Sequence, residues 1–316
     1  MVIAVASGKG GTGKTTVAVS LALSLVEGDG YPPNRLSPPL LVDCDVENPN
    51  AHLFLRPEVV DRAPATVEVP AIDHSRCTLC GDCAEACRFN AIALLGEQLR
   101  LFPELCHGCG SCALVCPAAA ISEIPRTIGT LEAGHAGGLR FAKGSLKVGE
   151  PLAVPVIRQL KNWAALSSEE TTIIDSPPGT SCPMVETVTG ADFVILVTEP
   201  TPSGLHDLEL ADQVLHEMGL PAGVVINRDA TGYEDLDDFC ERTGLPVLLR
   251  IPFDREVAKA LAQGVPLVRT LPEYRHAFIR IASDIQSAMP AVPPSRAGFR
   301  RRIQHDLGVI AQERGL

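Results

Sequence analysis

The first residues whose spacing predicts chemistry form a glycine-rich loop near the start of the chain, GKGGTGKT from Gly8 to Thr15. The loop fits the pattern G-x-x-x-x-G-K-[ST], and it lies between the apolar run VIAVA and the helix-like run TVAVSLALSL. Glycines let successive backbone N–H groups point into a concave nest for phosphate oxygens, and the N-terminus of the following helix adds partial positive charge. We therefore expect a nucleotide phosphate site, with Lys14 bridging the β- and γ-phosphates and the Thr15 hydroxyl on Mg²⁺. The residues expected to contact the nucleotide here are Gly10, Gly11, Thr12, Gly13, Lys14, Thr15 and Thr16.

A second set of chemically spaced residues lies between Cys77 and Cys116, where eight of the chain's 11 cysteines fall. Two runs share the spacing C-x₂-C-x₂-C-x₃-C, and the second is followed by Pro117. This is the spacing of bacterial two-cluster ferredoxins, in which three close thiolates bind one [4Fe–4S] cluster and the fourth crosses to the other. We expect one cluster on Cys77, Cys80, Cys83 and Cys116, and the other on Cys106, Cys109, Cys112 and Cys87.

Zinc and disulfides are the alternative explanations for these eight cysteines. Zinc sites usually pair two C-x₂-C knuckles and do not need a third close cysteine. Disulfides are rare in cytosolic proteins. The spacing therefore favours iron–sulfur clusters, with one departure, because Arg88 stands where the first run would have proline.

The elements that must position these groups alternate between strands and helices. Short apolar runs such as LLVDCD, TTIID and FVILVT are typical of buried parallel strands, and helical patterns lie between several of them. Strands that alternate with helices predict right-handed βαβ units on one parallel sheet. From about Thr66 to Pro125, small residues, cysteines and glycines replace this pattern, so we expect an insert with little apolar core that metal would hold together.

The chain therefore predicts an α/β fold in three parts. A discontinuous P-loop nucleotide domain with a parallel sheet comprises residues 1–65 and 126–285. An inserted, bacterial ferredoxin-like α+β domain comprises residues 66–125, and a C-terminal tail comprises residues 286–316.

An additional lysine, Lys9, stands near the start of the phosphate loop. The loop resembles the deviant Walker A motif, K-G-G-x-G-K-T, of the family that includes MinD, Mrp-type proteins and the nitrogenase iron protein. In that family the early lysine reaches across a dimer to the partner's nucleotide, where a cation supplied in trans stabilises charge in the transition state. With its insert, the chain over about residues 1–285 resembles the MinD-superfamily P-loop ATPases that contain an inserted ferredoxin domain.

This resemblance implies roles for carboxylates at the ends of two expected strands. Asp43 and Asp45 lie in LVDCDVENPN, and Asp175 lies in IIDSPPGT. Asp43 would support the Mg²⁺ shell, and Asp175, at the Walker B position, would hold Mg²⁺ through water. Asp45 would orient the attacking water, so the catalytic residues would be Lys9, Lys14 and Asp45.

Two residues give weaker sequence signals for contact with the base of the nucleotide. Asn227 in VVINRD resembles the adenine-contacting asparagine of the family, and Pro252 in RIPFDREV resembles the other adenine-side position. The guanine signature N-K-x-D is not matched, since Arg228 and Ala230 stand where it has Lys and Asp. ATP is therefore expected rather than GTP.

The resemblance leaves the physiological task open between three hypotheses. In the first, an Mg²⁺-ATP-dependent dimerising ATPase carries two [4Fe–4S] clusters and couples ATP to electron transfer or cluster delivery. The others are an iron–sulfur scaffold with a timing ATPase, and a positioning ATPase with redox-sensing clusters. The expected partners are a second copy or a related ATPase, and a redox or apo-iron–sulfur protein. Cys182 has the spacing of a cluster cysteine in the nitrogenase iron protein, but an idle thiol is the more ordinary interpretation.

Charge and hydropathy restrict partners and location. A net charge of −11 and an aromatic content of 4% argue against nucleic-acid binding. No apolar run approaches the ~18 residues of a spanning helix, and the first residues lack a signal-peptide pattern, so a cytoplasmic protein is expected.

The tail carries five arginines between Ala291 and Leu316 and an apolar stripe, which favour docking on protein over membrane binding. The stripe consists of Phe299, Ile303, Leu307 and Ile310.

Overall fold

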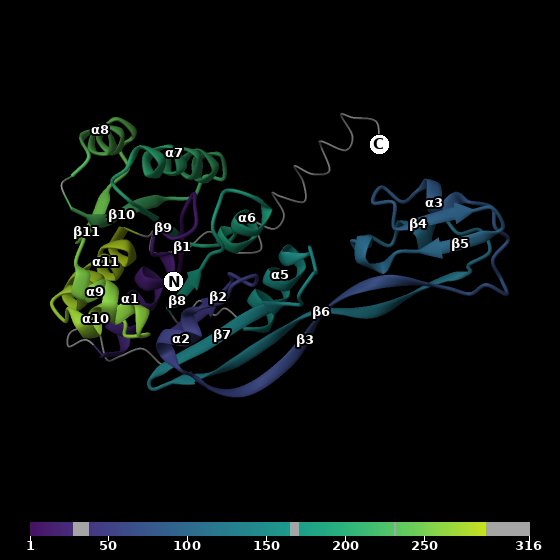
Figure 1. Ribbon diagram of the computed structural model, residues 1–316, viewed down its shortest axis with the longest axis horizontal. Coiled ribbons are helices and arrows are strands. Elements are labelled where there is room, and N and C mark those ends of the chain that lie inside the picture. The colour runs from purple at the N-terminus through teal and green to yellow at the C-terminus, as the bar shows by residue number, and fades with distance from the viewer. Residues whose placement is uncertain (28–37, 165–170, 231, 289–316) are drawn as a thin grey trace.

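A nine-stranded sheet forms the body of the protein, in the order β11-β10-β9-β1-β8-β2-β7-β6-β3 (Figure 1). The computed structural model describes residues 1–27, 38–164, 171–230 and 232–288. Neighbouring strands from β11 to β7 are parallel, whereas β6 and β3 are antiparallel to their neighbours. The strands are β1 (Val2–Ala6), β2 (Leu40–Asp43), β3 (Glu58–Ile72), β6 (Ile121–Ala136), β7 (Leu139–Leu146), β8 (Thr172–Asp175), β9 (Phe193–Thr198), β10 (Ala222–Asp229) and β11 (Val247–Pro252).

Helices cover both faces of this sheet, which explains the continuous apolar runs of its central strands. In β1, Ile3 and Val5 face the core that contains α1 and α11, while Val2 and Ala4 face the core that contains α5 and α6. The expected α/β fold with a parallel sheet is confirmed. The helices of the body are α1 (Lys14–Glu27), α2 (Ala51–Leu55), α5 (Ala153–Trp163), α6 (Cys182–Val188), α7 (Pro202–Glu217), α8 (Glu234–Thr243), α9 (Arg255–Ala262), α10 (Leu267–Thr270) and α11 (Tyr274–Ala288).

The two longest strands, β3 and β6, leave the sheet together as a two-stranded ribbon. They pair from Glu58↔His135 to Ile72↔Ile121, but β6 pairs with β7 only up to Gly129. The register shifts where Ala65 pairs with Gly129 and Thr66 with Thr127, so Ile128 is an extra residue and forms a β-bulge. The expected domain boundaries at 65/66 and 125/126 fall next to this bulge, and the sequence did not reveal the ribbon.

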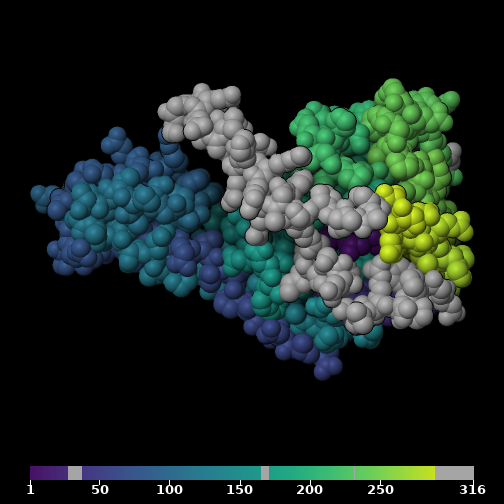
Figure 2. Space-filling model, turned by 180° about the vertical axis from the view of Figure 1, so that it is seen from behind, coloured from purple at the N-terminus to yellow at the C-terminus, as the bar shows by residue number. Residues whose placement is uncertain are grey.

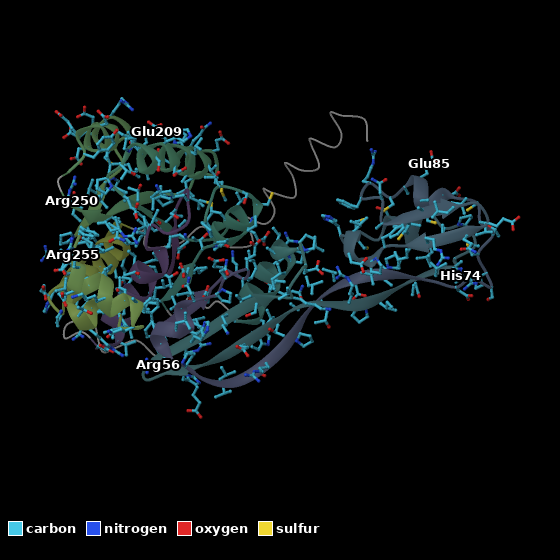
Figure 3. The ribbon with its side chains drawn as sticks, in the orientation of Figure 1. Arg56, His74, Glu85, Glu209, Arg250 and Arg255 are labelled. Atoms are coloured by element: carbon cyan, nitrogen blue, oxygen red, sulfur yellow. The ribbon has the colours of Figure 1, made fainter. Side chains whose placement is uncertain are left out.

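The ribbon ends in a small lobe of residues 73–120, at the opposite end of the molecule from α8 and α9 (Figures 1 and 2). Arg56 and His74, which flank β3, show how far the ribbon reaches (Figure 3). A small buried cluster of Cys83, Ile92 and Leu99 lies within the lobe, while Ala91 and Cys106 belong to the larger core cluster that includes Val67 and Val69 of β3. The elements of the lobe are α3 (Asp82–Glu85), β4 (Ile92–Leu95), β5 (Gln98–Leu101), η1 (Pro103–Leu105) and α4 (Ser111–Leu114).

Within the described ranges, none of the helices combines the length and apolar character needed to cross a bilayer. Of the expected basic tail, 286–316, only residues 286–288 are described, and they belong to α11. Its apolar stripe lies outside the described residues.

Candidate functional site

The phosphate loop connects the end of β1 to the start of α1. Gly11 and Gly13 have φ angles of +83° and +97°, a region that favours glycine, and so the loop can turn its N–H groups inward. A Cβ atom on Gly13 would lie 2.3 Å from Nδ2 of Asn227. That amide donates a hydrogen bond of 2.8 Å to the carbonyl of Thr12. Asn227 therefore lies directly against the phosphate loop, and a larger residue at position 13 would collide with it.

Lys14 is buried at the base of this loop. Its Nζ donates a hydrogen bond of 3.0 Å to Oγ of Ser7, which in turn donates to the carbonyl of Lys9 at 2.5 Å. Burial lowers the pKa of Lys14, while the negative charges of Asp175 and Asp45 act in the opposite direction. The loop thus holds one buried amine beside a set of carboxylates, and Ser7 is a positioning contact that the sequence did not reveal.

Two carboxylates end neighbouring strands beside the loop. Asp43 on β2 and Asp175 on β8 are register partners, and both side chains are fully buried. Asp43 accepts hydrogen bonds from the backbone N–H groups of Asn50 at 2.9 Å and Ala51 at 3.0 Å. Neither carboxylate oxygen of Asp175 has a partner of normal hydrogen-bond geometry among the described residues, although the Thr15 hydroxyl is close enough to lower its pKa.

The electrostatics of these carboxylates fit a cation. Burial raises the pKa of Asp43 to about 7, and the nearby charge of Asp45 adds to this rise. Burial also raises the pKa of Asp175 well above its ordinary value, with the charge of Asp43 as the next cause. The pKa of Asp45 is raised by burial as well. Asp175, a buried carboxylate without a donor of normal geometry in the described residues, is suited to Mg²⁺, which prefers carboxylate and water oxygens.

Lys9 points away from the phosphate loop within its own chain. Its Nζ donates a hydrogen bond of 2.6 Å to Oγ of Ser203 and lies 3.9 Å from the Asp207 carboxylate, both on α7. A Cβ on Gly8 would lie 2.0 Å from the Asp207 carbonyl oxygen, so the loop packs tightly against this helix. The expected reach of Lys9 to a partner's nucleotide stays a prediction.

The two residues expected near adenine lie on adjacent strands. Asn227 is on β10, and Pro252 ends β11 as the register partner of Asp229. Both polar atoms of the Asn227 side chain form hydrogen bonds, since its Oδ1 also accepts from the Arg228 N–H at 3.0 Å. Asn227 is thus placed at the nucleotide loop, and contact of either residue with adenine stays a prediction.

In the small lobe, the eight clustered cysteines line two separate pockets. Each pocket combines three cysteines of one run with the last cysteine of the other, which is the grouping of the expected ligand sets, and cluster binding by them stays a prediction. The pocket nearer the ribbon also includes Glu68, Pro70 and Glu123 in its wall. Figure 3 shows the sulfur atoms gathered in this lobe, between the labelled Glu85 and His74. The first pocket contains Cys87, Cys106, Cys109 and Cys112, and the second contains Cys77, Cys80, Cys83 and Cys116.

Backbone N–H groups already point at several of these sulfurs. Ala91 donates to Sγ of Cys87 at 3.3 Å, and Ala120 donates to Sγ of Cys116 at 3.3 Å. Such contacts stabilise thiolate charge. At the same time, no three His, Cys, Asp or Glu side chains in the described ranges lie close enough together to hold a single metal ion.

The remaining cysteines do not join either pocket. Cys44 and Cys240 are buried, and burial raises the pKa of both thiols, to about 11 for Cys240, which makes them unreactive. Cys182 is exposed at the start of α6.

An exposed aromatic pair that the sequence did not reveal lies in the wall of the first pocket. The rings of Phe89 and His107 stack with their centroids 3.8 Å apart.

A phosphate loop between a parallel strand and a helix, with buried carboxylates at the ends of adjacent strands, defines a P-loop nucleotide-binding protein. Residues 3–267 match the CobQ/CobB/MinD/ParA nucleotide-binding domain, and the chain belongs to this family. It is an ATPase of the MinD/ParA type, for which the fold implies ATP and Mg²⁺.

Individual relatives agree with this assignment. Two uncharacterized proteins of Methanocaldococcus jannaschii are 32% and 28% identical, each over 84% of this chain and 90% of their own length. An iron–sulfur cluster carrier protein of Pyrococcus horikoshii is 24% identical over 84% of this chain and 78% of its own. The solved structure of the septum site-determining protein MinD from Pyrococcus horikoshii, complexed with Mg-ADP, covers 90% of this chain and 95% of its own, with a TM-score of 0.54 and 20% identity. That likeness concerns the fold alone.

Proposed function

We propose that this ATPase is an Mg²⁺-ATP-dependent switch that dimerises around nucleotide and holds two [4Fe–4S] clusters in its small lobe. ATP binding and hydrolysis would control electron transfer, or cluster delivery, to a redox or apo-iron–sulfur partner. The observation that carries the proposal is the composition of the two cysteine pockets. Each takes its fourth cysteine from the other run, as each cluster of a two-cluster ferredoxin takes its fourth ligand from the other run.

The number and origin of the cysteines at each pocket fit a cluster, since three come from one run and one from the other. Thiolates around one tetrahedral zinc lie about 3.8 Å apart, because each Zn–S bond is about 2.3 Å. Each pocket is lined by four cysteines. A four-iron cube spreads its ligands more widely, and when bound it would supply one-electron redox chemistry.

In the nucleotide site, the chain's own groups have separate tasks. The loop amides and Lys14 would bind the phosphates, and the Thr15 hydroxyl with Asp43 and Asp175 would hold the Mg²⁺ shell. Asp45 would orient the attacking water, since its backbone N–H is bonded to Asp43 at 3.2 Å and its carboxylate lies near Lys14. Lys9 would leave Ser203 and supply its charge to the partner's nucleotide.

Cluster delivery is the second candidate, and the similarity to an iron–sulfur cluster carrier protein favours it. The two tasks differ in what leaves the protein. Electron transfer requires clusters that are reduced and reoxidised in place, whereas delivery requires that iron and sulfide move together to an apo-protein.

The proposal is tested by measuring how fast an iron chelator removes iron from anaerobic protein, without nucleotide, with Mg-ADP and with Mg-ATP. We expect Mg-ATP to change this rate severalfold in the natural chain. Lys14→Ala, which removes the buried cation of the phosphate loop, should abolish the effect and leave the iron content unchanged. Equal rates in all three nucleotide states would contradict coupling between the ATPase and the lobe.

A further inference from the structure

We propose that helix α5 transmits the state of the nucleotide site to the small lobe, and that Gln159 is the residue that positions the ribbon for this purpose. The inference deepens the proposed function and rests on it. It concerns how a change beside Asp175 reaches a lobe at the far end of β3 and β6.

Apolar side chains of α5 pack on the ribbon, and in the described residues one side chain of this helix, Gln159, also forms hydrogen bonds with β3. Nε2 of Gln159 donates to the carbonyl oxygen of Thr66 at 2.8 Å, and its Oε1 accepts from the Thr66 N–H at 3.0 Å. Gln159 therefore satisfies both backbone groups of one β3 residue, as a neighbouring strand would. The same Nε2 also donates to the carbonyl of Pro155 at 3.1 Å, which fixes the side chain on its own helix.

The place of this contact is the root of the ribbon. Thr66 lies at the register shift opposite the bulged residue Ile128, where the ribbon departs from the sheet. Just beyond it, Arg126 of β6 forms an ion pair with Glu150, in the loop that leads into α5. Glu150 is nearly buried, with 5% of its side chain exposed. Both strands of the ribbon are thus held by α5 or by the loop before it, at the point where a bulge allows bending.

The other side of α5 is joined to α6. Nζ of Lys161 donates to three carbonyl oxygens at the end of α6, at 2.7, 2.9 and 2.8 Å, those of Glu186, Thr187 and Thr189. Arg158 forms a bidentate pair with Glu186, with contacts of 3.1 and 2.7 Å. Because the half-buried Lys161 ammonium donates charge-assisted hydrogen bonds, these bonds hold α5 to α6 more firmly than neutral hydrogen bonds would.

Helix α6 is in turn attached to the nucleotide site. It begins at Cys182, a few residues after Asp175, and the intervening segment is hydrogen-bonded to β1 and to Ser7 at the start of the phosphate loop. The Ser176 N–H donates to the carbonyl of Val5 at 3.0 Å, and the Gly179 N–H donates to the carbonyl of Ser7 at 3.0 Å. A shift of this segment when nucleotide changes would therefore move α6, and α5 with it.

Because the ribbon is long, a small movement at its root displaces the lobe at its end. Seven residues of β3 from Thr66 to Ile72, at about 3.4 Å each, extend roughly 20 Å beyond the bulge. A rotation of about 10° at Thr66 would then displace the lobe by about 4 Å, from the same strand geometry. Contacts made at the root thus control the position of both cysteine pockets.

The alternative is that Gln159 only supports the ribbon statically. Both roles predict some loosening when Gln159 is replaced, but only the coupling role predicts that the response to ATP disappears. The experiment is hydrogen exchange of the anaerobic, full-length protein, read at peptides covering 66–72 and 121–128, with and without Mg-ATP. Gln159→Met keeps the length of the side chain and removes its hydrogen bonds. Asn162→Ala, at an exposed position of the same helix, is the matched control.

We expect Mg-ATP to change the exchange rate of these peptides severalfold in the natural chain and in Asn162→Ala. In Gln159→Met the rates with and without Mg-ATP should be equal, while nucleotide affinity and iron content are retained. If Gln159→Met loses iron, Gln159→Glu, which keeps the acceptor for the Thr66 N–H, should show a reduced response. A full response to ATP in either Gln159 variant would overturn the inference and leave the proposed function standing. Absence of any response in the natural chain would overturn both.

Discussion

Asp43 and Asp175 lie side by side at the ends of two parallel strands, fully buried and within each other's electrostatic influence. Two like charges in one buried site raise the cost of ionisation for both. Asp43 is compensated by backbone N–H groups, whereas Asp175 has no such donor of normal geometry in the described part of the chain. The pair is therefore arranged to be completed by a divalent cation.

This arrangement predicts that Mg²⁺-dependent nucleotide binding strengthens as pH rises through 7. Because the folded pKa of Asp43 is raised to about 7, a proton competes with Mg²⁺ below that pH. Each pH unit below 7 should weaken binding by up to about tenfold. In the nucleotide-free protein the sign is opposite: protonated Asp43 favours folding, and this contribution is lost as pH rises from its unfolded pKa through 7.

Titration calorimetry with Mg-ADP between pH 6 and 8 measures the binding effect. Asp43→Asn, which cannot be deprotonated, should bind Mg-ADP more weakly and with a flatter pH profile. A natural chain whose affinity is constant over this range would contradict the role given to Asp43.

Gly13→Ala should disrupt the phosphate loop. The substitution places a Cβ at a φ of +97° and 2.3 Å from the Asn227 amide, so the loop or the amide must move. The left-handed backbone alone costs about 1–2 kcal/mol. Gly10→Ala is the matched control, because its Cβ would approach other atoms no closer than 3.9 Å. Binding of fluorescent ATP should fall at least tenfold in Gly13→Ala, because the collision with Asn227 adds to the cost of the left-handed backbone. It should fall much less in Gly10→Ala.

The two lysines of the loop should separate binding from turnover. Lys14→Ala removes the buried amine and should abolish nucleotide binding. Lys9→Ala should bind nucleotide nearly normally, because Nζ of Lys9 is hydrogen-bonded to Ser203 on α7 in the natural chain. If Lys9 acts in trans, its loss should prevent ATP-dependent dimerisation in size-exclusion chromatography and lower turnover by about 10³-fold. Normal dimerisation and hydrolysis by Lys9→Ala would contradict that role.

One cysteine substitution should remove one cluster selectively. Cys80→Ser changes a wall residue of the second pocket and should reduce iron content by half, while the first pocket, nearer the ribbon, keeps its cluster. Cys182→Ser, an exposed cysteine outside both pockets, is the control and should keep full iron content. Iron analysis and EPR of the reduced proteins measure the difference. Equal iron loss in both variants would contradict the assignment of ligands.

The nucleotide loop and the parallel sheet could be predicted from sequence because their signals are local. The residues from Gly8 to Thr15 carry the whole loop motif, and strands such as Leu40–Asp43 are continuous apolar runs. The grouping of cysteines in the two pockets could also be predicted, because the runs have the spacing of two-cluster ferredoxins, in which the fourth cysteine of each run crosses to the other cluster.

The ribbon could not be predicted in the same way. Its strand β3 contains Pro64 and Pro70 and alternates little in polarity, and its partner β6 lies far along the chain. Contacts such as that of Gln159 with Thr66 depend on how α5 packs against this ribbon. Long-range contacts between polar groups leave no periodic signal in the sequence.

The proposed function requires two four-iron clusters in the small lobe, under the control of the ATPase. Its most direct test is the content of iron and acid-labile sulfide in anaerobically isolated full-length protein. Two cubes predict about eight irons and about eight sulfides per chain, with EPR signals of [4Fe–4S] clusters after reduction. Protein that binds zinc stoichiometrically and contains no sulfide would contradict the claim.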